Sequence, residues 1–308
     1  MSKIRRDFLR MVVLTCLACG VVCVLWAQPR VPGPADFTIV EPIAGSDLPL
    51  QLTFIQTIDG IHTPVSMRKP KGEGPFPAVL FLEGNGGGGM QRARGVMLHS
   101  GYTPEVFLKA GYVVAWLRYR AEVPWAYPKA GKLVPKGNIM PRAPLDYDDL
   151  ISTVGYFKKL PYVDPKRVAL VGSSHGGELI LKAVTEIDVA AGVCSEPATA
   201  EYLGFAGSEP PEGNAPPKNK PEAMERIRKI NTPLLVMGRD SDHNQKMFRL
   251  TYDWLKEAGR QVEWVSHDHP RHGFIYVRRD QSGAYNPDPI QRTAIDHMAA
   301  FLAKHLGK

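Results

Sequence analysis

The chain has 308 residues, of which 22% are charged and 44% hydrophobic, and these values are typical of a soluble globular protein with a large core. Its formal net charge of +7 overstates the basicity of the folded part, because four basic residues and one acidic residue among the first 27 supply +3 and leave +4. The remainder contains no basic run, which argues against nucleic acid as a partner.

The N-terminus has the pattern of an export signal. Basic residues at 3–10 precede an uncharged apolar run over 11–25, and Ala27 is a suitable last residue before cleavage. The stretch Arg5-Arg6-Asp7-Phe8-Leu9-Arg10 is similar to the twin-arginine signal that exports folded bacterial proteins. We therefore expect residues 1–27 to be a signal peptide and the mature protein to be periplasmic or extracellular. The alternative is an uncleaved inner-membrane anchor, for which the apolar run is short.

The predicted mature chain, residues 28–308, reads as a single domain that retains one cysteine, Cys194. We expect this thiol to be buried and no intramolecular disulfide to form. Residues 28–45 read as an extended leader rich in proline and glycine. A half-buried strand over 50–55 and its hairpin partner over 62–67 follow, joined by the turn signal Asp59-Gly60.

A buried strand over 78–82 runs into the glycine-rich stretch Glu83-Gly84-Asn85-Gly86-Gly87-Gly88-Gly89. Such a stretch exposes backbone N–H groups. It could cradle a phosphate, but no Gly-Lys-Ser/Thr follows. It could be a flexible tether. We favour a third reading, in which the N–H of Asn85, or alternatively of Gly86, helps to bind an oxyanion.

The next segment alternates helix and strand. Thr103 is expected to cap a short helix that ends at Gly111, and a strand over 112–117 follows. Residues 123–145 carry five prolines and read as an irregular insertion, in which Trp125 and Tyr127 could stack on a substrate or pack inward. Apolar spacing predicts a helix over 147–157, with Asp146 to Asp149 supplying acid to its first turn.

The most informative stretch is Val168 to Gly177, where a buried strand meets Gly172-Ser173-Ser174-His175-Gly176 and continues into a predicted helix. A strand, a sharp turn and a helix with serine at the apex place the hydroxyl above the sheet edge, where it can act as a nucleophile. Ser174 is preferred to Ser173 because only Ser174 has glycine at both −2 and +2. The backbone N–H of His175 is the second candidate oxyanion donor.

The remaining elements again alternate. A second irregular insertion is expected over 195–229, and further elements follow at 233–238 (strand), 247–258 (helix), 262–265 (strand) and 294–302 (helix). The order predicts an α/β fold, with a mainly parallel sheet covered by helices on both faces and an N-terminal antiparallel hairpin.

Three loops at the carboxyl ends of strands carry serine, aspartate and histidine in that order. His272 would take the proton of Ser174 as base, and a carboxylate would orient its imidazole. Asp242 is our choice and Asp240 stays open. A metal site built from His267, Asp268, His269 and His272 is the alternative interpretation. The triad interpretation needs no cofactor and no metal.

These residues resemble a known family. The motif Tyr162 to Val168, the elbow Gly172 to Gly177 and the motif His272-Gly273-Phe274 are similar to α/β-hydrolases of the prolyl oligopeptidase-like or dienelactone hydrolase-like type. The resemblance, which begins near Ala78, implies the α/β-hydrolase fold and a serine hydrolase. In true oligopeptidases the acid usually stands three residues after the strand glycine, where this chain has Ser241.

We expect an exported serine esterase that forms an acyl-enzyme on Ser174 from a small-molecule ester, without nucleic acid and with the membrane involved only through an uncleaved N-terminus. The alternatives are a small peptidase or amidase with the same triad, and a non-catalytic envelope binding protein on the hydrolase scaffold. The sequence does not predict the oligomeric state.

Overall fold

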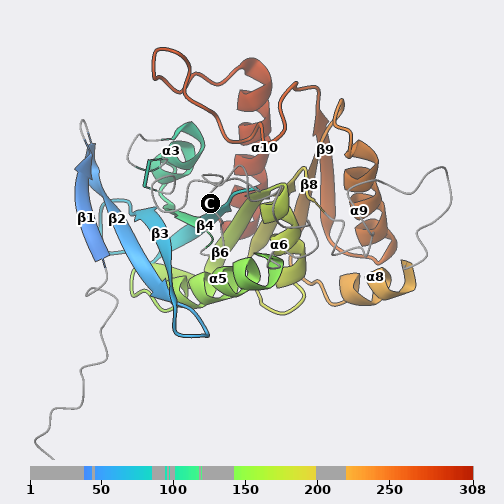
Figure 1. Ribbon diagram of the computed structural model, residues 1–308, viewed down its shortest axis with the longest axis horizontal. Coiled ribbons are helices and arrows are strands. Elements are labelled where there is room, and N and C mark those ends of the chain that lie inside the picture. Colours follow the sequence, from blue (N-terminus) through green and yellow to red (C-terminus); the bar gives the residue numbers. More distant parts are fainter. Residues whose placement is uncertain are drawn as a thin grey trace, which may run out of the picture. The chain divides into compact units, whose positions relative to one another are not determined.

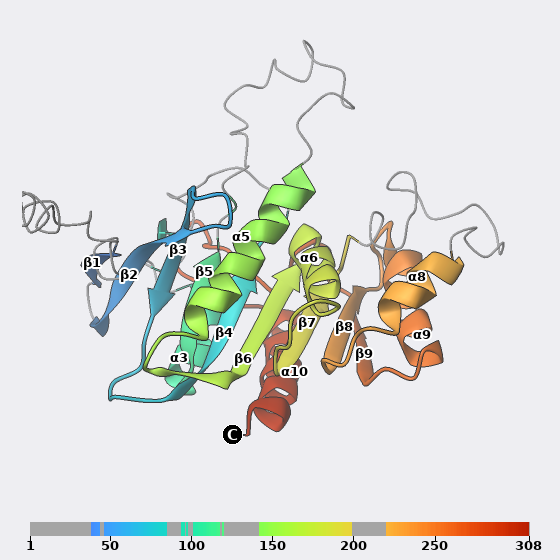
Figure 2. The same cartoon turned by 90° about the horizontal axis from the view of Figure 1, so that it is seen from below.

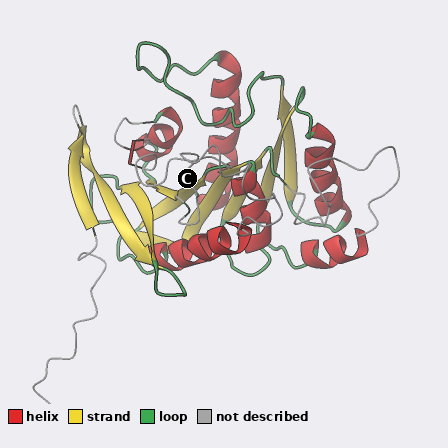
Figure 3. Ribbon diagram, viewed as in Figure 1, coloured by secondary structure: helices red, strands yellow, loops and turns green. Residues whose placement is uncertain are grey.

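A nine-stranded sheet forms the centre of the fold (Figures 1 and 3). The structure is a computed structural model that describes residues 38–43, 46–84, 94–95, 97, 101–117, 119, 142–198 and 220–307. The strands are β1 Thr38–Ile43, β2 Ser46–Gln56, β3 His62–Arg68, β4 Phe76–Leu82, β5 Val113–Leu117, β6 Val163–Ser173, β7 Ala191–Ser195, β8 Leu234–Arg239 and β9 Val262–His267. The helices are α3 Tyr102–Lys109, α5 Arg142–Phe157, α6 His175–Ala183, α8 Lys220–Ile227, α9 Gln245–Glu257 and α10 Pro289–Leu306.

The strand order is β1-β2-β3-β5-β4-β6-β7-β8-β9, and every neighbouring pair from β5 to β9 is parallel. The first three strands pair antiparallel with their neighbours. The prediction of a mainly parallel sheet with an N-terminal hairpin is therefore confirmed. Strand β1 was not expected, because its sequence lies in the segment that reads as an extended leader.

Helices cover both faces of the sheet, as predicted. Along β4, Ala78 and Leu80 belong to one apolar cluster and Val79 and Phe81 to the other, because successive side chains of a strand point to opposite faces. Helices α5, α6, α8 and α9 contribute to the first cluster, and α3 and α10 to the second. In Figure 2, α5 and α6 lie in front of the strands and α10 behind them. None of the helices in the described ranges is long and apolar enough to cross a membrane.

Two helix starts differ from the sequence prediction. Helix α5 begins at Arg142, inside the predicted insertion, so Asp146 to Asp149 do not lie in its first turn. Proline is tolerated in a first turn, and Pro144 stands there. Helix α3 has Gly101 rather than Thr103 as its N-cap, and the Thr103 hydroxyl instead donates to the carbonyl of Ile275.

The irregular insertions fall mostly outside the described residues, as do residues 1–37 with the predicted signal peptide. Trp125 and Tyr127 also lie outside them. The second insertion is shorter than predicted, because Ser195 ends β7 and α8 begins at Lys220. Cys194 is buried, and burial raises the pKa of its thiol.

The register of the parallel strands brings their carboxyl ends together. Gly172 of β6 lies beside Leu82 of β4 and Cys194 of β7, and Arg239 of β8 lies beside His267 of β9. The residues that follow these strands therefore meet at one edge of the sheet. This edge is where the sequence analysis places Ser174, Asp242 and His272.

The glycines of the elbow allow α6 to approach this edge closely. A Cβ on Gly176 would stand 2.5 Å from the carbonyl oxygen of Leu82, which is backbone and cannot swing away. We therefore predict that Gly176→Ala lowers the free energy of unfolding by about 2 kcal/mol or more and the melting temperature by about 5 °C. Gly155→Ala is the matched control: Gly155 lies in α5 with no atom within 4 Å of its Cβ position, so alanine should stabilise by about 0.5–1 kcal/mol. Equal melting temperatures for the two variants would contradict the packing argument.

Candidate active site

Ser174 occupies a strained turn between β6 and α6. Its backbone has φ 56° and ψ −119°, a sparsely populated region for a residue with a side chain. A Cβ on Gly172 would stand 2.5 Å from the backbone of Gly176, so the turn closes only with glycine there. The Ser174 N–H donates to the carbonyl of Ser195 at 2.9 Å, and its carbonyl accepts from the Ala198 N–H at 3.0 Å. The turn is thereby fixed from β7 as well as from its own strand and helix.

His272 and Asp242 form a hydrogen-bonded pair. The distance from His272 Nδ1 to Asp242 Oδ2 is 2.9 Å. The Asp242 side chain is fully buried, while that of His272 is 39% exposed. The second carboxyl oxygen of Asp242 accepts from the Asn244 N–H at 2.8 Å. With Nδ1 bonded to a carboxylate, Nε2 is the imidazole nitrogen left for proton exchange.

Asp240, the alternative acid, does not face His272, because its carboxylate accepts from the Ser266 hydroxyl. The other histidines of the proposed metal site are also separate from His272. His269 bonds to Asp288 at 3.0 Å, and the ring of His267 packs against that of His297.

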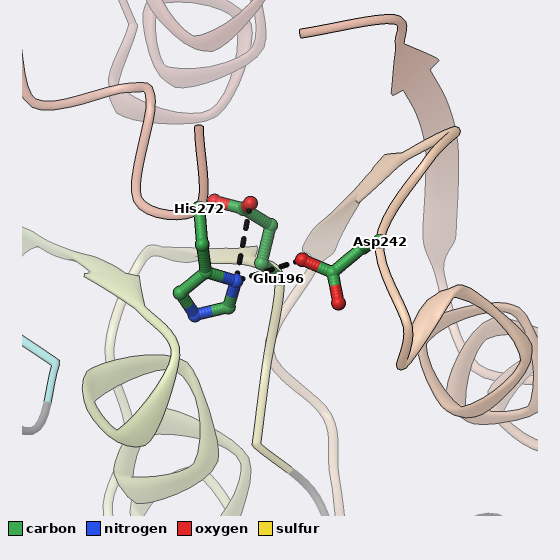
Figure 4. Close-up of side chains that lie close together, drawn as sticks. All are labelled: Glu196, Asp242 and His272. Carbon is green, nitrogen blue, oxygen red and sulfur yellow. Dashed lines mark hydrogen bonds and ion pairs between the residues drawn. The ribbon is translucent and has the colours of Figure 1, made fainter. Parts of the chain in front are cut away.

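A buried glutamate that the sequence analysis did not select completes this cluster (Figure 4). Glu196 follows β7, and its Oε1 lies 3.4 Å from His272 Nδ1 while its Oε2 accepts from the Gly273 N–H at 2.8 Å. Arg239, also missed, donates to Asp242 Oδ2 at 2.7 Å and lies 3.3 Å from Glu196 Oε1. The sequence signal that could have identified Glu196 and Arg239 is the one used for Ser174, namely a polar residue at the end of a buried strand or directly after it.

The guanidinium of Arg239 contacts both carboxylates. Glu196, Asp242 and His272 are the described His, Cys or acidic side chains whose ligand atoms lie close enough together, within 4.8 Å, to share a metal ion. Arg239 already supplies the positive charge at the same oxygens. The cluster therefore reads as an ion-pair network around a histidine.

The environment separates the pKa values of the two carboxyl groups. Burial opposes charge on Asp242, but the Asn244 N–H, His272 and Arg239 outweigh it and hold the pKa of that carboxyl below its ordinary value. Burial raises the pKa of the Glu196 carboxyl, although His272 and the Gly273 N–H act in the opposite direction. Asp242 is thus the carboxylate that more readily carries the negative charge beside His272.

A pocket of about 500 Å³ opens over Ser174 and His272. It is lined by Glu83, which follows β4, and by Trp116 of β5, which donates from Nε1 to Glu83 Oε2 at 3.3 Å. Residues 276–279 form part of the wall. The volume is in the range of sites for small molecules.

Of the candidate oxyanion donors, His175 is described, and Asn85 and Gly86 lie outside the described residues. The first N–H groups of a helix have no partner within it, and His175 is the first residue of α6. Its backbone N–H is therefore placed next to the serine, at the positive end of the helix dipole.

The His175 side chain has a separate role, in an ion pair with α5. Its Nε2 lies 2.9 Å from Asp146 Oδ2, and its Nδ1 lies 3.8 Å from Glu178. Burial disfavours the charged imidazole, but hydrogen bonds to Asp146 and Glu178 outweigh burial and raise the pKa of His175 to about 9. His175 is therefore protonated at neutral pH, and with both nitrogens engaged it cannot serve as the base.

This ion pair predicts a pH-dependent stability. Because the folded pKa of His175 is raised from 6.5 to about 9, its contribution is complete below pH 6.5 and is lost as pH rises through 9. Relative to Asp146→Asn, the wild-type free energy of unfolding should fall by up to about 3 kcal/mol between those limits. Denaturant unfolding at pH 6, 7.5 and 9.5 measures the difference. Asp148→Asn, on the same helix, should keep the wild-type slope, and a wild-type slope in Asp146→Asn would contradict the assignment.

Comparison with solved structures gives many α/β-hydrolases. A protein assigned as a dienelactone hydrolase from Klebsiella pneumoniae has a TM-score of 0.61 and 18% identity, covering 84% of this chain and all of that one. A Pyrococcus horikoshii acylaminoacyl peptidase has a TM-score of 0.58 and 18% identity, covering 85% of this chain and 42% of that one. A thermophilic esterase from Thermogutta terrifontis has a TM-score of 0.56 and 17% identity, covering 82% and 93%. No curated protein matches the sequence.

At these identities the structural likeness shows the α/β-hydrolase fold. The family comes from the sequence, because residues 99–308 match the model of the prolyl oligopeptidase family, peptidase family S9. That segment contains the elbow, Asp242 and His272. The chain therefore belongs to the prolyl oligopeptidase family and is a hydrolase with the α/β-hydrolase fold.

Proposed function

We propose that this protein is an exported serine hydrolase that cleaves carboxylic esters, with Ser174, His272 and Asp242 as its catalytic triad. The observation that carries the proposal is the convergence at one pocket of a serine on a strained elbow and a histidine already paired with a buried carboxylate. Both Ser174 and His272 line that pocket.

The reaction would follow from the roles of these groups. The Ser174 hydroxyl attacks the ester carbonyl while His272 Nε2 accepts its proton, and Asp242 stabilises the resulting imidazolium. The oxyanion accepts from the His175 N–H and from an N–H of the glycine-rich loop at Asn85 or Gly86. His272 returns the proton to the departing alcohol. Water, deprotonated by the same imidazole, then attacks the acyl-enzyme and releases the acid and Ser174.

Ester substrates are supported by the sizes of the similar structures. The chain spans the whole of the dienelactone hydrolase and 93% of the thermophilic esterase, but less than half of the acylaminoacyl peptidase. An alcohol is also a better leaving group than an amine. The family match to peptidases favours the second candidate, a peptidase or amidase that uses the same triad.

The comparison of ester and amide substrates tests the proposal. The protein should hydrolyse p-nitrophenyl acetate with a kcat/KM at least 100-fold above that for aminoacyl or prolyl p-nitroanilides. Ser174→Ala should lower kcat by about 10⁵-fold or more and leave the melting temperature within a few degrees. Comparable rates on anilides would favour the peptidase. A folded protein that cleaves neither class and is not labelled by a fluorophosphonate would favour a non-catalytic binding protein.

Export is proposed from residues 1–27, which lie outside the described part of the chain. The adjacent arginines and the short apolar run that follows are the support. In a bacterial host, Arg5→Lys together with Arg6→Lys should leave the precursor in the cytoplasm, because the twin-arginine pathway reads the paired guanidinium groups. Cell fractionation and the size of the product measure this. The matched control is Arg10→Lys. Unimpaired export of the double variant would contradict the twin-arginine route, and full-length protein in the inner membrane would favour the anchor.

A further inference from the structure

Glu196 faces His272 without a full set of partners. Its side chain is fully buried, and within the described part of the chain its Oε1 accepts no hydrogen bond. That oxygen nevertheless lies 3.4 Å from His272 Nδ1, only slightly farther than the 2.9 Å of Asp242 Oδ2. A buried carboxylate oxygen without a hydrogen bond is costly, so its position beside the His272 imidazole calls for a function.

The backbone holds Glu196 in this place at some cost. Its φ of 48° is in the left-handed region, which a glutamate seldom adopts. Its N–H donates to the carbonyl of Met237 at 2.8 Å, and the neighbouring residues Ser195 and Ala198 bond to Ser174. The segment over 195–198 therefore contacts the strand before Asp242, the nucleophile turn and, through Gly273, the loop of the base.

We propose that Glu196 is a second carboxylate for His272, a positioning residue that shares the Nδ1 proton with Asp242 and takes over the bond when Asp242 is neutralised. Glu196 Oε2 fixes the His272 loop through the Gly273 N–H, and Oε1 is the reserve acceptor. Arg239, bound to Asp242 and beside Glu196, makes two carboxylates tolerable at this depth. This proposal rests on the proposed function.

The charged groups facing His272 are consistent with Asp242 as its first carboxylate partner and Glu196 as its second. Asp242 and Arg239 come from β8 and the turn after it, and Glu196 comes from the end of β7. The lowered pKa of Asp242 and the raised pKa of Glu196 make Asp242 the principal partner and Glu196 the second.

A double-mutant cycle tests the inference. Glu196→Gln keeps an oxygen for the Gly273 N–H and removes the charge, and Asp242→Asn removes the principal acid. We expect Glu196→Gln to lower kcat on p-nitrophenyl acetate about 10-fold at unchanged KM. Asp242→Asn should lower kcat about 100-fold, less than the roughly 10⁴-fold loss known for a triad with one acid. The double variant should fall about 10⁴-fold or more, beyond the product of the single losses, because no carboxylate remains beside His272 to stabilise its positive charge. Asp240→Asn is the matched control and should behave as wild type.

A purely structural role for Glu196 gives a different result. If Glu196 only supports the His272 loop, the kcat loss of the double variant should equal the product of the losses of the two single variants. If Asp242 is the single functional acid, Asp242→Asn alone should show the full loss of the double variant. Either outcome overturns the proposal. Glu196→Met, of similar size, replaces Glu196→Gln if the latter does not fold.

Proton NMR separates this inference from the proposed function. A strongly downfield Nδ1 proton of His272, assigned by its absence in His272→Ala, should persist in Asp242→Asn and disappear in the double variant, whether or not any ester is cleaved. Its disappearance in Asp242→Asn overturns the inference. Failure of the hydrolase proposal would appear instead as no labelling of wild-type Ser174 by a fluorophosphonate.

Discussion

The strained turn at Ser174 is the constraint on which the rest of the site depends. A residue with a Cβ holds φ 56° only when its surroundings over-determine it. Here the Ser174 N–H donates to Ser195 at the end of β7, and the Ser174 carbonyl accepts from Ala198 just after it. Glycine at 172 and 176 lets the strand and the helix pack closely around the serine. The same close approach brings α6 onto the end of β4, beside the start of the glycine-rich loop. The serine turn and the start of α6 are thus consequences of the same close packing.

Charge balance is the second organising principle at this sheet edge. Two buried carboxylates within 4.8 Å of each other and of an imidazole would repel strongly if unpaired. Arg239 bonds to Asp242 and lies beside Glu196, so its positive charge offsets part of their mutual repulsion. A network of this kind is weak evidence for stability, because removing charges from water costs much of what their attraction returns.

The sequence predicts the fold and three members of the site because those features are local. Alternating and continuous apolar runs specify strands, and the elbow carries its own glycines. The choice between Asp240 and Asp242 is not local, because it depends on contacts with distant residues: Asp242 bonds to His272, and Asp240 accepts from the Ser266 hydroxyl. Glu196 and Arg239 follow or end ordinary buried strands, and their meaning appears only when the parallel register brings those strand ends together. The sequence predicts Asp146 as an acid in the first turn of a helix, because it does not show that α5 begins at Arg142, four residues before Asp146. The bond between Asp146 and His175 is likewise not visible in the sequence.

The different surroundings of His175 and His272 suit one histidine to a structural role and the other to the proposed role of base. His175 is buried, with Nε2 bonded to Asp146 and Nδ1 in an ion pair with Glu178, and it is protonated at neutral pH, so it carries a fixed charge that anchors the first turn of α6. His272 is partly exposed in the pocket, with one nitrogen bonded to Asp242 and the other left for the substrate. A base must exchange its proton within each turnover, and a fully paired imidazolium cannot. His175, adjacent to Ser174 in sequence, is therefore structural, and the proposed base His272 lies in a loop 98 residues after Ser174.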